Sequence, residues 1–323
     1  MGLDTENDGC MICKAILETT DRYLLRFAPG VEWQLVSSPE KTDLLHRTAF
    51  VMDLEKVTTP PNAPRMLFTR CDPSCETCLN LATEKSIDSK ENGLDETRSW
   101  KSFELPYMRM WIHPGRKDIL CQCLHWDNVV SDMARIKGAL NPVYSSIIEQ
   151  DGFPVHGALV QYDGKGILLA GHGDVGKSTA CARLPHPFEP LCDDETLIVY
   201  DNGAYYAHPM PTWSSYQNDA PLKSTSVRQK VPLAAIFFLK QSPKDYSIPM
   251  GKGESSVRLH QSSSETLATY AFFSLKTVTG DIRKKLYDNT SAVSKNIPSY
   301  TLHLSLTGDF WTDILAIQKK KGL

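Results

Sequence analysis

Residues 171–179 are Gly171, His172, Gly173, Asp174, Val175, Gly176, Lys177, Ser178 and Thr179, and they fit the pattern G-x-x-x-x-G-K-[ST]. This pattern is typical of the phosphate-binding loop of nucleotide-binding proteins, because its glycines let main-chain N–H groups wrap around an anion. Lys177 would reach the β- and γ-phosphates, and the Ser178 hydroxyl would bind Mg²⁺. The stretch therefore predicts a binding site for a nucleotide and its magnesium ion.

The residues on either side of this loop favour the strand–loop–helix frame that the pattern needs. Gly166–Ala170 is a short apolar run typical of a buried strand, and Ala158–Val160 predicts a strand that pairs with it. After the loop, Ser178–Leu184 can form a short helix whose N-terminus faces the anion. The alternative is a glycine-rich turn in an unrelated loop.

Two further places in the second half carry residues that suit phosphoryl transfer. Asp193 and Asp194 come just before an apolar strand run, Thr196–Tyr200. Adjacent residues of an extended chain point to opposite sides, so one carboxylate can bind Mg²⁺ while the other accepts a proton from an attacking hydroxyl. His156, on the strand before the loop, could hold Asp193 in place. A polar loop or helix cap is the alternative for the acidic pair, and a structural role is the alternative for His156.

The segment from His208 to Ser214 combines polar residues with the ring of Trp213. We expect either a lip for an acceptor peptide or nucleotide, or a turn packed by the tryptophan. Phosphoryl transfer also favours an arginine near the γ-phosphate. The candidates are Arg183, Arg228 and Arg258, and the sequence does not choose among them.

A chain of 323 residues is long enough for two domains that each bury a core. We predict an N-terminal α/β domain over residues 1–150, which could dock a peptide, and a phosphate-loop domain over residues 151–323. A helical segment divided at Pro142 would join them. Further predicted elements are strands at Tyr23–Phe27, Val31–Val36, Thr48–Met52 and Tyr107–Ile112, and a helix at Ser264–Leu275.

Charge and hydropathy exclude several classes of protein. The chain has 35 Lys and Arg against 38 Asp and Glu, which argues against a dedicated nucleic-acid binder. No run of about 18 apolar residues occurs, so no membrane span is predicted. The first residues are acidic and polar, unlike a secretory signal, so we expect a cytoplasmic protein.

Some of the 9 cysteines lie in close-set groups. Two C-x-x-C pairs could together hold a structural Zn²⁺, and they are formed by Cys10, Cys13, Cys75 and Cys78. The two pairs are much farther apart in the sequence than those of a compact zinc ribbon, so ordinary free thiols are the alternative. Cys181 and Cys192, which both follow the phosphate loop in the sequence, are expected to be small buried residues.

The order and spacing of His156-Gly157, the phosphate loop and Asp193-Asp194 resemble the HPr kinase/phosphorylase family and its relative, phosphoenolpyruvate carboxykinase. In detail the second half looks most like the SynChlorMet cassette proteins of the C type, found beside radical-SAM enzymes and small carrier proteins in peptide-modifying gene clusters. Kinases that phosphorylate lasso-peptide precursors on serine are similar too. The stretches that carry the resemblance are HGALV (156–160), LCDDETL (191–197), HPMPTWS (208–214) and VPLAAIFFL (231–239).

The resemblance implies an α/β fold with a mixed twisted sheet of the HPr-kinase type and a smaller N-terminal α/β domain. It also implies an ATP- and Mg²⁺-dependent enzyme that phosphorylates a Ser or Thr of a precursor peptide or small protein. Carried over by position, Lys177 binds the β/γ-phosphates, Ser178 and Asp194 bind Mg²⁺, Asp193 is the base, and His156 orients that base.

Two features separate the chain from HPr kinases. Thr179 stands where those enzymes have Glu, and no Glu-x-Arg-Gly motif follows the Asp-Asp strand, so HPr is not the implied acceptor. The alternative to a kinase is a nucleotide-binding accessory protein that recruits a precursor peptide without phosphorylating it. The ring assemblies common in the HPr kinase family also imply a homo-oligomer.

Overall fold

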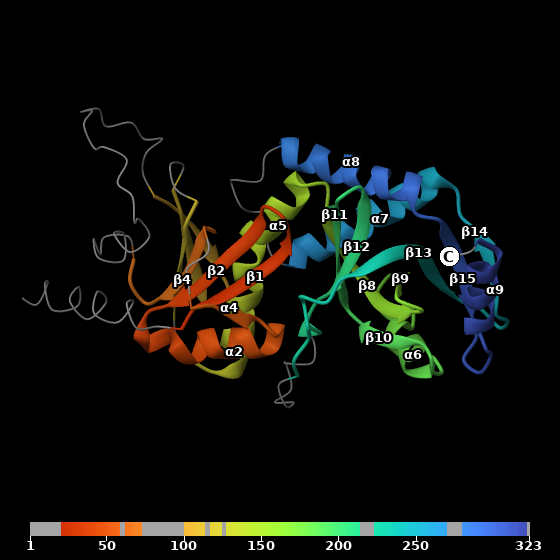
Figure 1. Cartoon of the computed structure of the whole chain (residues 1–323), viewed down its shortest axis with the longest axis horizontal. Coiled ribbons are helices and arrows are strands. Elements are labelled where there is room, and N and C mark those ends of the chain that lie inside the picture. The colour runs from red at the N-terminus through yellow and green to blue at the C-terminus, as the bar shows by residue number, and fades with distance from the viewer. Residues whose placement is uncertain are drawn as a thin grey trace, which may run out of the picture. The chain divides into compact units, whose positions relative to one another are not determined.

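The computed structural model describes residues 21–58, 62–72, 100–113, 117–124, 127–213, 223–269 and 280–321 (Figure 1). These residues form two compact units. The first runs to Leu140, and the second starts at Asn141 and also takes in the turn Phe27–Val31. Four cysteines proposed above as zinc ligands lie outside the described residues: Cys10, Cys13, Cys75 and Cys78.

The first unit is built on one mixed sheet. Its strands are β1 (Tyr23–Ala28), β2 (Val31–Ser37), β3 (Glu55–Lys56), β4 (Arg65–Thr69), β5 (Lys101–Leu105), β6 (Met108–Ile112) and β7 (Ile119–Cys123). They pair in the order β3-β1-β2-β4-β7-β6-β5. The pairs β2–β4 and β4–β7 are parallel, whereas β5–β6 and β6–β7 are antiparallel. The helical elements of this unit are η1 (Pro39–Lys41), α2 (Thr42–Met52) and α4 (Val129–Ala139).

The predicted strand at Thr48–Met52 is wrong, because these residues form the second half of α2. Leu44, Leu45, Thr48 and Met52 are buried, and Phe50 is 53% exposed. Burial at intervals of three to four residues is the period of a helix. A five-residue apolar run is too short to distinguish that period from the alternation of a strand.

The second unit is built on a mixed sheet of eight strands among the described residues. They are β8 (Phe153–Tyr162), β9 (Lys165–Ala170), β10 (Glu189–Cys192), β11 (Glu195–Asp201), β12 (Ala204–Pro209), β13 (Val231–Gln241), β14 (Tyr246–Pro249) and β15 (Ser299–Leu304). The order is β10-β8-β11-β12-β13-β15-β14, and β9 pairs with both β8 and β13. The pairs β13–β9 and β13–β15 are parallel and the others antiparallel, which confirms the predicted mixed sheet.

Strand β8 pairs with β11 along its first half and with β9 along its second half. This change of partner sets the distance between the end of β9 and the start of β11. His156 pairs with Glu195 at the start of β11, whereas the next residue, Gly157, pairs with Ala170 at the end of β9. A side chain at position 157 would collide with β9, because a Cβ there would lie 2.8 Å from Leu168 Cδ1. The end of β9 and the start of β11 are therefore brought to the same part of β8.

Helices cover the sheet of the second unit on two sides. They are α5 (Asn141–Glu149), α6 (Lys177–Arg183), α7 (Lys252–Thr269), α8 (Gly280–Asn296) and α9 (Trp311–Lys321). In Figure 1, α7 and α8 lie together above the strands and α6 lies below them. Helix α7 starts well before Ser264, where the sequence predicted its beginning, and residues 270–275 of the predicted helix lie outside the described residues. The predicted division of the helical segment near Pro142 is confirmed by the boundary between α4 (Val129–Ala139) and α5 (Asn141–Glu149).

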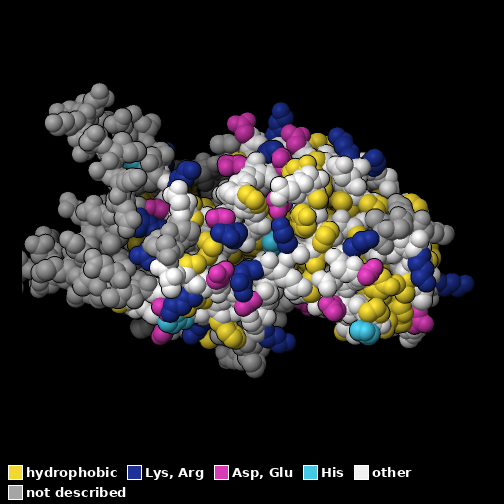
Figure 2. Space-filling view, viewed as in Figure 1, with side chains coloured by type: hydrophobic (Ala, Val, Ile, Leu, Met, Phe, Trp, Pro, Cys, Tyr) yellow, Lys and Arg dark blue, Asp and Glu magenta, His cyan; other side chains and the backbone are white. Residues whose placement is uncertain are grey.

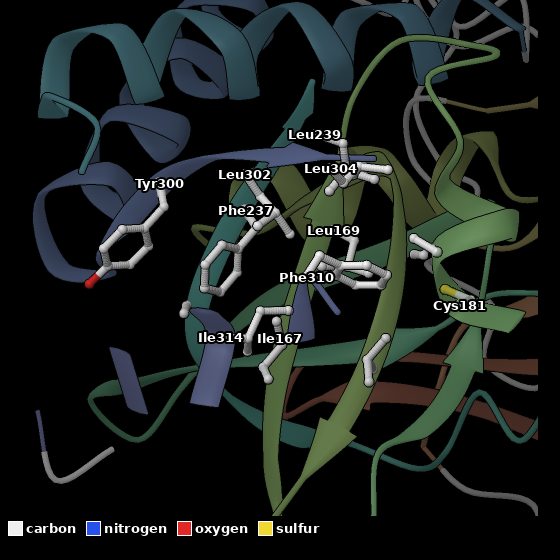
Figure 3. Packing of buried hydrophobic residues seen from close by; sticks show 14 of the residues in the cluster. Ile167, Leu169, Cys181, Phe237, Leu239, Tyr300, Leu302, Leu304, Phe310 and Ile314 are labelled. Carbon is white, nitrogen blue, oxygen red and sulfur yellow. The ribbon is translucent and has the colours of Figure 1, made fainter. Parts of the chain in front are cut away.

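A hydrophobic core cluster of the second unit lies between the sheet and helices α6 and α9 (Figure 3). Phe237 of β13 stacks on Tyr300 of β15 with ring centroids 5.1 Å apart. Phe310 and Ile314 come from the α9 region and Cys181 from α6, and all three are buried in the same cluster. Burying such large apolar side chains is what stabilises the strand that leads into the phosphate loop.

The charge distribution on the surface and the composition of the helices relate to two classes of protein considered in the sequence analysis, nucleic-acid binders and membrane-spanning proteins. On the face drawn in Figure 2, basic and acidic side chains are interspersed, and neither sign of charge forms a continuous stripe. Among the described helices, none combines the length and apolar composition needed to cross a bilayer.

Candidate functional site

The phosphate loop lies where the sequence predicted it, between the end of β9 and the start of α6. The loop passes through left-handed conformations at two residues: Gly176, with φ of 103°, adopts one without strain, and Asp174, with φ of 59°, is of a residue type that visits this region more readily than most. Lys177 folds back over the loop. Its Nζ donates hydrogen bonds of 2.9 Å to the carbonyl oxygens of both Gly171 and His172.

Lys177 is a buried cation whose hydrogen-bond partners among the described residues are main-chain oxygens. Its side chain is 6% exposed, and among the described residues no carboxylate lies within ion-pair distance of Nζ. Burial lowers the pKa of Lys177, while the nearby charges of Asp194, Asp174, Glu265 and Asp193 oppose that shift. A buried ammonium group without a direct counter-ion favours binding of an anion, as a nucleotide phosphate would provide.

The predicted carboxylate pair lies in the turn between β10 and β11. Both Asp193 and Asp194 are half-buried. Nδ1 of His156 donates a 2.9 Å hydrogen bond to the main-chain oxygen of Asp194, and it lies 3.2 Å from Oδ1 of the same residue. The imidazole therefore contacts Asp194, whereas the sequence analysis expected it to hold Asp193.

Asp193 is instead held by Thr212. The Thr212 hydroxyl donates a 2.5 Å hydrogen bond to Asp193 Oδ1. Thr212 follows β12 in the segment that the sequence predicted to be either a lip or a packed turn. Trp213 is buried at 6% exposure, as the packed turn predicts, and Thr212 lines the cavity of the site. The lip for a peptide or nucleotide stays a prediction. No local pattern in the sequence predicted that Thr212 would meet Asp193.

These residues surround one cavity of about 440 Å³ in the second unit. Its lining is His156, Gly173, Asp174, Gly176, Lys177, Ser178, Thr179, Asp193, Asp194 and Thr212. All three residues predicted to be catalytic and both predicted magnesium ligands are in this lining. Of the other loop residues, Gly171 and His172 line a separate small cavity of about 40 Å³, and Val175 packs against the core.

Glu195, the third acid of the Asp-Asp-Glu run, does not face this cavity. It is 4% exposed, and its carboxylate accepts a hydrogen bond from the hydroxyl of Tyr144 on α5. Cys181 and Cys192 are buried as expected, and burial raises their thiol pKa values to about 12 and about 11. These three groups are therefore buried away from the cavity, and the acids of the run that line it are Asp193 and Asp194.

Two of the three arginines considered as partners of the γ-phosphate, Arg183 and Arg258, differ in what their side chains contact. Arg183 donates to the main-chain oxygens of Ser305 and Gly308, so its guanidinium is used in holding that loop. Arg258 of α7 lines the 40 Å³ cavity together with Gly171 and His172. Arg258 is thus the one of these two that lies next to the phosphate loop.

The donor set fits a magnesium ion that is shared with a nucleotide. Within the described ranges, no group of three His, Cys, Asp or Glu side chains is arranged to hold a metal by itself. Mg²⁺ in phosphoryl-transfer sites commonly takes one or two protein oxygens and completes its shell with phosphate oxygens and water. Ser178 and Asp194 line the same cavity, and each carries a side-chain oxygen of the kind that such an ion binds.

The fold and the site together define a mixed α/β protein built around a phosphate-loop motif, with a pair of carboxylates beside the loop. Within that class, the chain belongs to the family described as SynChlorMet cassette protein ScmC, whose family model matches residues 119–319. This match confirms the resemblance noted in the sequence.

Comparison with solved structures gave a similarity to the Hpr(Ser) kinase/phosphatase from Coxiella burnetii. The sequence identity is 10%, the similarity covers 52% of this chain and 92% of that chain, and the TM-score is 0.29. Comparison with curated proteins gave no match.

Proposed function

We propose that this protein is an ATP- and Mg²⁺-dependent kinase that transfers a phosphoryl group to a Ser or Thr hydroxyl of a peptide or small protein. The observation that carries the proposal is the shared cavity, in which a buried lysine, a phosphate-loop motif and two carboxylates face one another. Phosphoryl transfer needs these groups for positioning, charge neutralisation and proton removal.

Each residue has a definite part in this proposal. The loop N–H groups and Lys177 bind the β- and γ-phosphates, and Lys177 exchanges its bonds to two carbonyl oxygens for bonds to phosphate. Mg²⁺ held by Ser178 and Asp194 would neutralise charge on the phosphate oxygens. Asp193 accepts the proton of the acceptor hydroxyl. His156 keeps Asp194 in place through its two contacts with that residue.

The acceptor class is supported by the family resemblance rather than by the cavity. SynChlorMet cassette proteins resemble the kinases of lasso-peptide precursors, and their gene clusters modify peptides. We therefore propose a precursor peptide as the acceptor and ribosomal peptide modification as the setting. We also propose a cytoplasmic protein that assembles as a homo-oligomer.

The test is mass spectrometry of precursor peptides from the same gene cluster after incubation with the protein, ATP and Mg²⁺. We expect the mass of one phosphoryl group to appear on a Ser or Thr of one peptide. Asp193→Asn should abolish this product and leave ATP binding nearly intact, because the amide keeps the shape of the side chain but cannot accept the proton.

A matched control is Asp163→Asn, which alters an exposed turn residue whose left-handed conformation asparagine tolerates. This variant should phosphorylate the peptide at the wild-type rate. Unchanged turnover in Asp193→Asn would refute the role of Asp193. Tight ATP binding with no phosphorylated peptide would instead favour an accessory protein that recruits the peptide.

A further inference from the structure

Thr212 has the geometry that an acceptor hydroxyl needs. Its Oγ1 donates a 2.5 Å hydrogen bond to Oδ1 of Asp193, the residue to which we assign proton removal. A general base must lie within hydrogen-bond reach of the proton that it takes. In this structure, the hydroxyl within reach of the base belongs to the protein itself.

The main chain and packing around Thr212 hold this hydroxyl in place. The N–H of Met210 donates a 3.1 Å hydrogen bond to the carbonyl oxygen of Glu195, two residues beyond Asp193. Met210 and Trp213 are both buried, at 0% and 6% exposure. The segment that carries Thr212 is therefore attached to β11 on one side of the threonine and packed into the interior on the other.

Thr212 also shares a cavity with the phosphate loop. It lines the same 440 Å³ cavity as Lys177 and Ser178. The cavity contains two other side-chain hydroxyls, those of Ser178 and Thr179, and neither donates a hydrogen bond to a carboxylate of the described residues. Ser178 is moreover assigned to the metal. Thr212 is therefore the hydroxyl in this lining that is prepared for proton transfer.

We propose that the protein phosphorylates its own Thr212, within one chain and at the expense of ATP. Thr212 Oγ1 forms a bond to the γ-phosphorus, and its proton passes to Asp193 Oδ1. The bond between that phosphorus and the bridging oxygen breaks, and its electron pair leaves on ADP. The inference rests on the proposed ATP-dependent transfer, but it does not depend on any peptide acceptor.

Modification at Thr212 has a consequence for external acceptors. A phosphothreonine no longer donates its hydroxyl to Asp193, and it adds about two negative charges beside two carboxylates. It would also occupy the place in which a peptide hydroxyl must meet the base. The modified protein therefore transfers phosphate to peptides more slowly than the unmodified protein.

The experiment uses the full-length protein, treated first with a protein phosphatase and then repurified. The protein is incubated with ATP and Mg²⁺ without peptide, and phosphate is located by fragmentation mass spectrometry. We expect phosphate at position 212, in amounts up to one per chain. Because the reaction is intramolecular, its first-order rate constant should not change when the protein is diluted.

Variants of Thr212 distinguish two roles for this residue: accepting the phosphoryl group, or only holding Asp193 in position. Thr212→Ser keeps a hydroxyl and should still be modified at position 212, whereas Thr212→Val should not be modified anywhere in the cavity. Asp193→Asn should lose the modification because the base is gone. Thr301→Val, a half-buried threonine on β15 away from the cavity, is the matched control and should be modified like the wild type.

The outcomes distinguish this inference from the proposed function. Peptide phosphorylation without phosphate at Thr212 would overturn the inference and leave the kinase proposal standing. Phosphate at Thr212 without any peptide product would support the inference and count against the peptide acceptor. A rate constant that rises with protein concentration would overturn the intramolecular step. ATP binding with neither product would overturn both proposals.

Discussion

Replacing Gly157 by alanine tests whether β8 holds the phosphate loop and the carboxylate pair in a fixed relation. Gly157 pairs with Ala170, the last residue before the loop, and its N–H donates a 3.0 Å hydrogen bond to the carbonyl oxygen of Asp194. A methyl group at this position would therefore strain β8 where it meets both parts of the site.

The size of the effect follows from the contacts of that methyl group. It would lie 2.8 Å from Leu168 Cδ1 and 3.2 Å from the carbonyl oxygen of Leu169, whereas ordinary contacts begin near 3.4 Å. Leu168 is 0% exposed, so its side chain cannot relieve the contact by moving out into solvent. Overpacking of this kind typically costs about 1–3 kcal/mol. We expect a loss of about 2 kcal/mol in the free energy of unfolding of the second unit.

The assay is urea unfolding followed by tryptophan fluorescence, with ATP affinity measured by calorimetry on the folded protein. Trp213 and Trp311 report on the second unit. The matched control is Gly251→Ala, because a Cβ at position 251 meets nothing within 4 Å and the residue has an ordinary φ. This control should change stability by less than about 0.5 kcal/mol.

The expected pattern is a loss of both stability and ATP affinity in Gly157→Ala and neither in Gly251→Ala. Equal stability in the two variants would show that β9 moves away without cost, which contradicts the packing argument. Lower stability with unchanged ATP affinity would show that the site does not depend on the register of β8.

Two further expectations concern pH. Burial lowers the pKa of Lys177 below the ordinary lysine value of 10.5, so ATP affinity should fall as the pH rises through a value below 10.5. Lys177→Arg, which stays charged, should show no such fall, and full wild-type affinity at pH 10.5 would contradict the argument. Burial also lowers the pKa of His208 from 6.5 to about 4, so between these values the unfolded chain binds a proton that the folded chain does not. The free energy of unfolding should therefore fall by up to about 3 kcal/mol as the pH drops from 6.5 to 4. Urea titrations should show a smaller fall for His208→Gln, and equal falls in both proteins would refute this role of His208.

The parts of the site that the sequence predicted are those formed by short, local patterns. The strand and helix on either side of the phosphate loop follow from an apolar run and a glycine–lysine motif, and both are confirmed. The strand after Asp194 is confirmed in the same way. The hairpin at Asn202-Gly203 has positive φ at both residues, as this dipeptide favours.

The contacts that the sequence could not predict depend on tertiary structure. The pairing of Thr212 with Asp193 joins the ends of two strands, β12 and β10, and neither residue carries a local signal for it. The contact of His156 with Asp194 in place of Asp193 depends on which way the turn between β10 and β11 points. Glu195 is adjacent to both aspartates, but strand alternation and Tyr144 direct it into the interior.

The change of partner along β8 affects how much the amino-acid sequence can change while the distances at the site stay the same. The register of His156 with Glu195 and of Gly157 with Ala170 is maintained by main-chain hydrogen bonds, which do not depend on side-chain identity. Substitutions that keep this pairing therefore leave the spacing between loop and carboxylates unchanged, and Gly157 is the exception because a side chain there would meet Leu168. Insertions in the connection from α6 to β10 can likewise be accommodated outside the paired residues. Descendants of such a protein can lose most of their sequence identity and still inherit the same distances at the site.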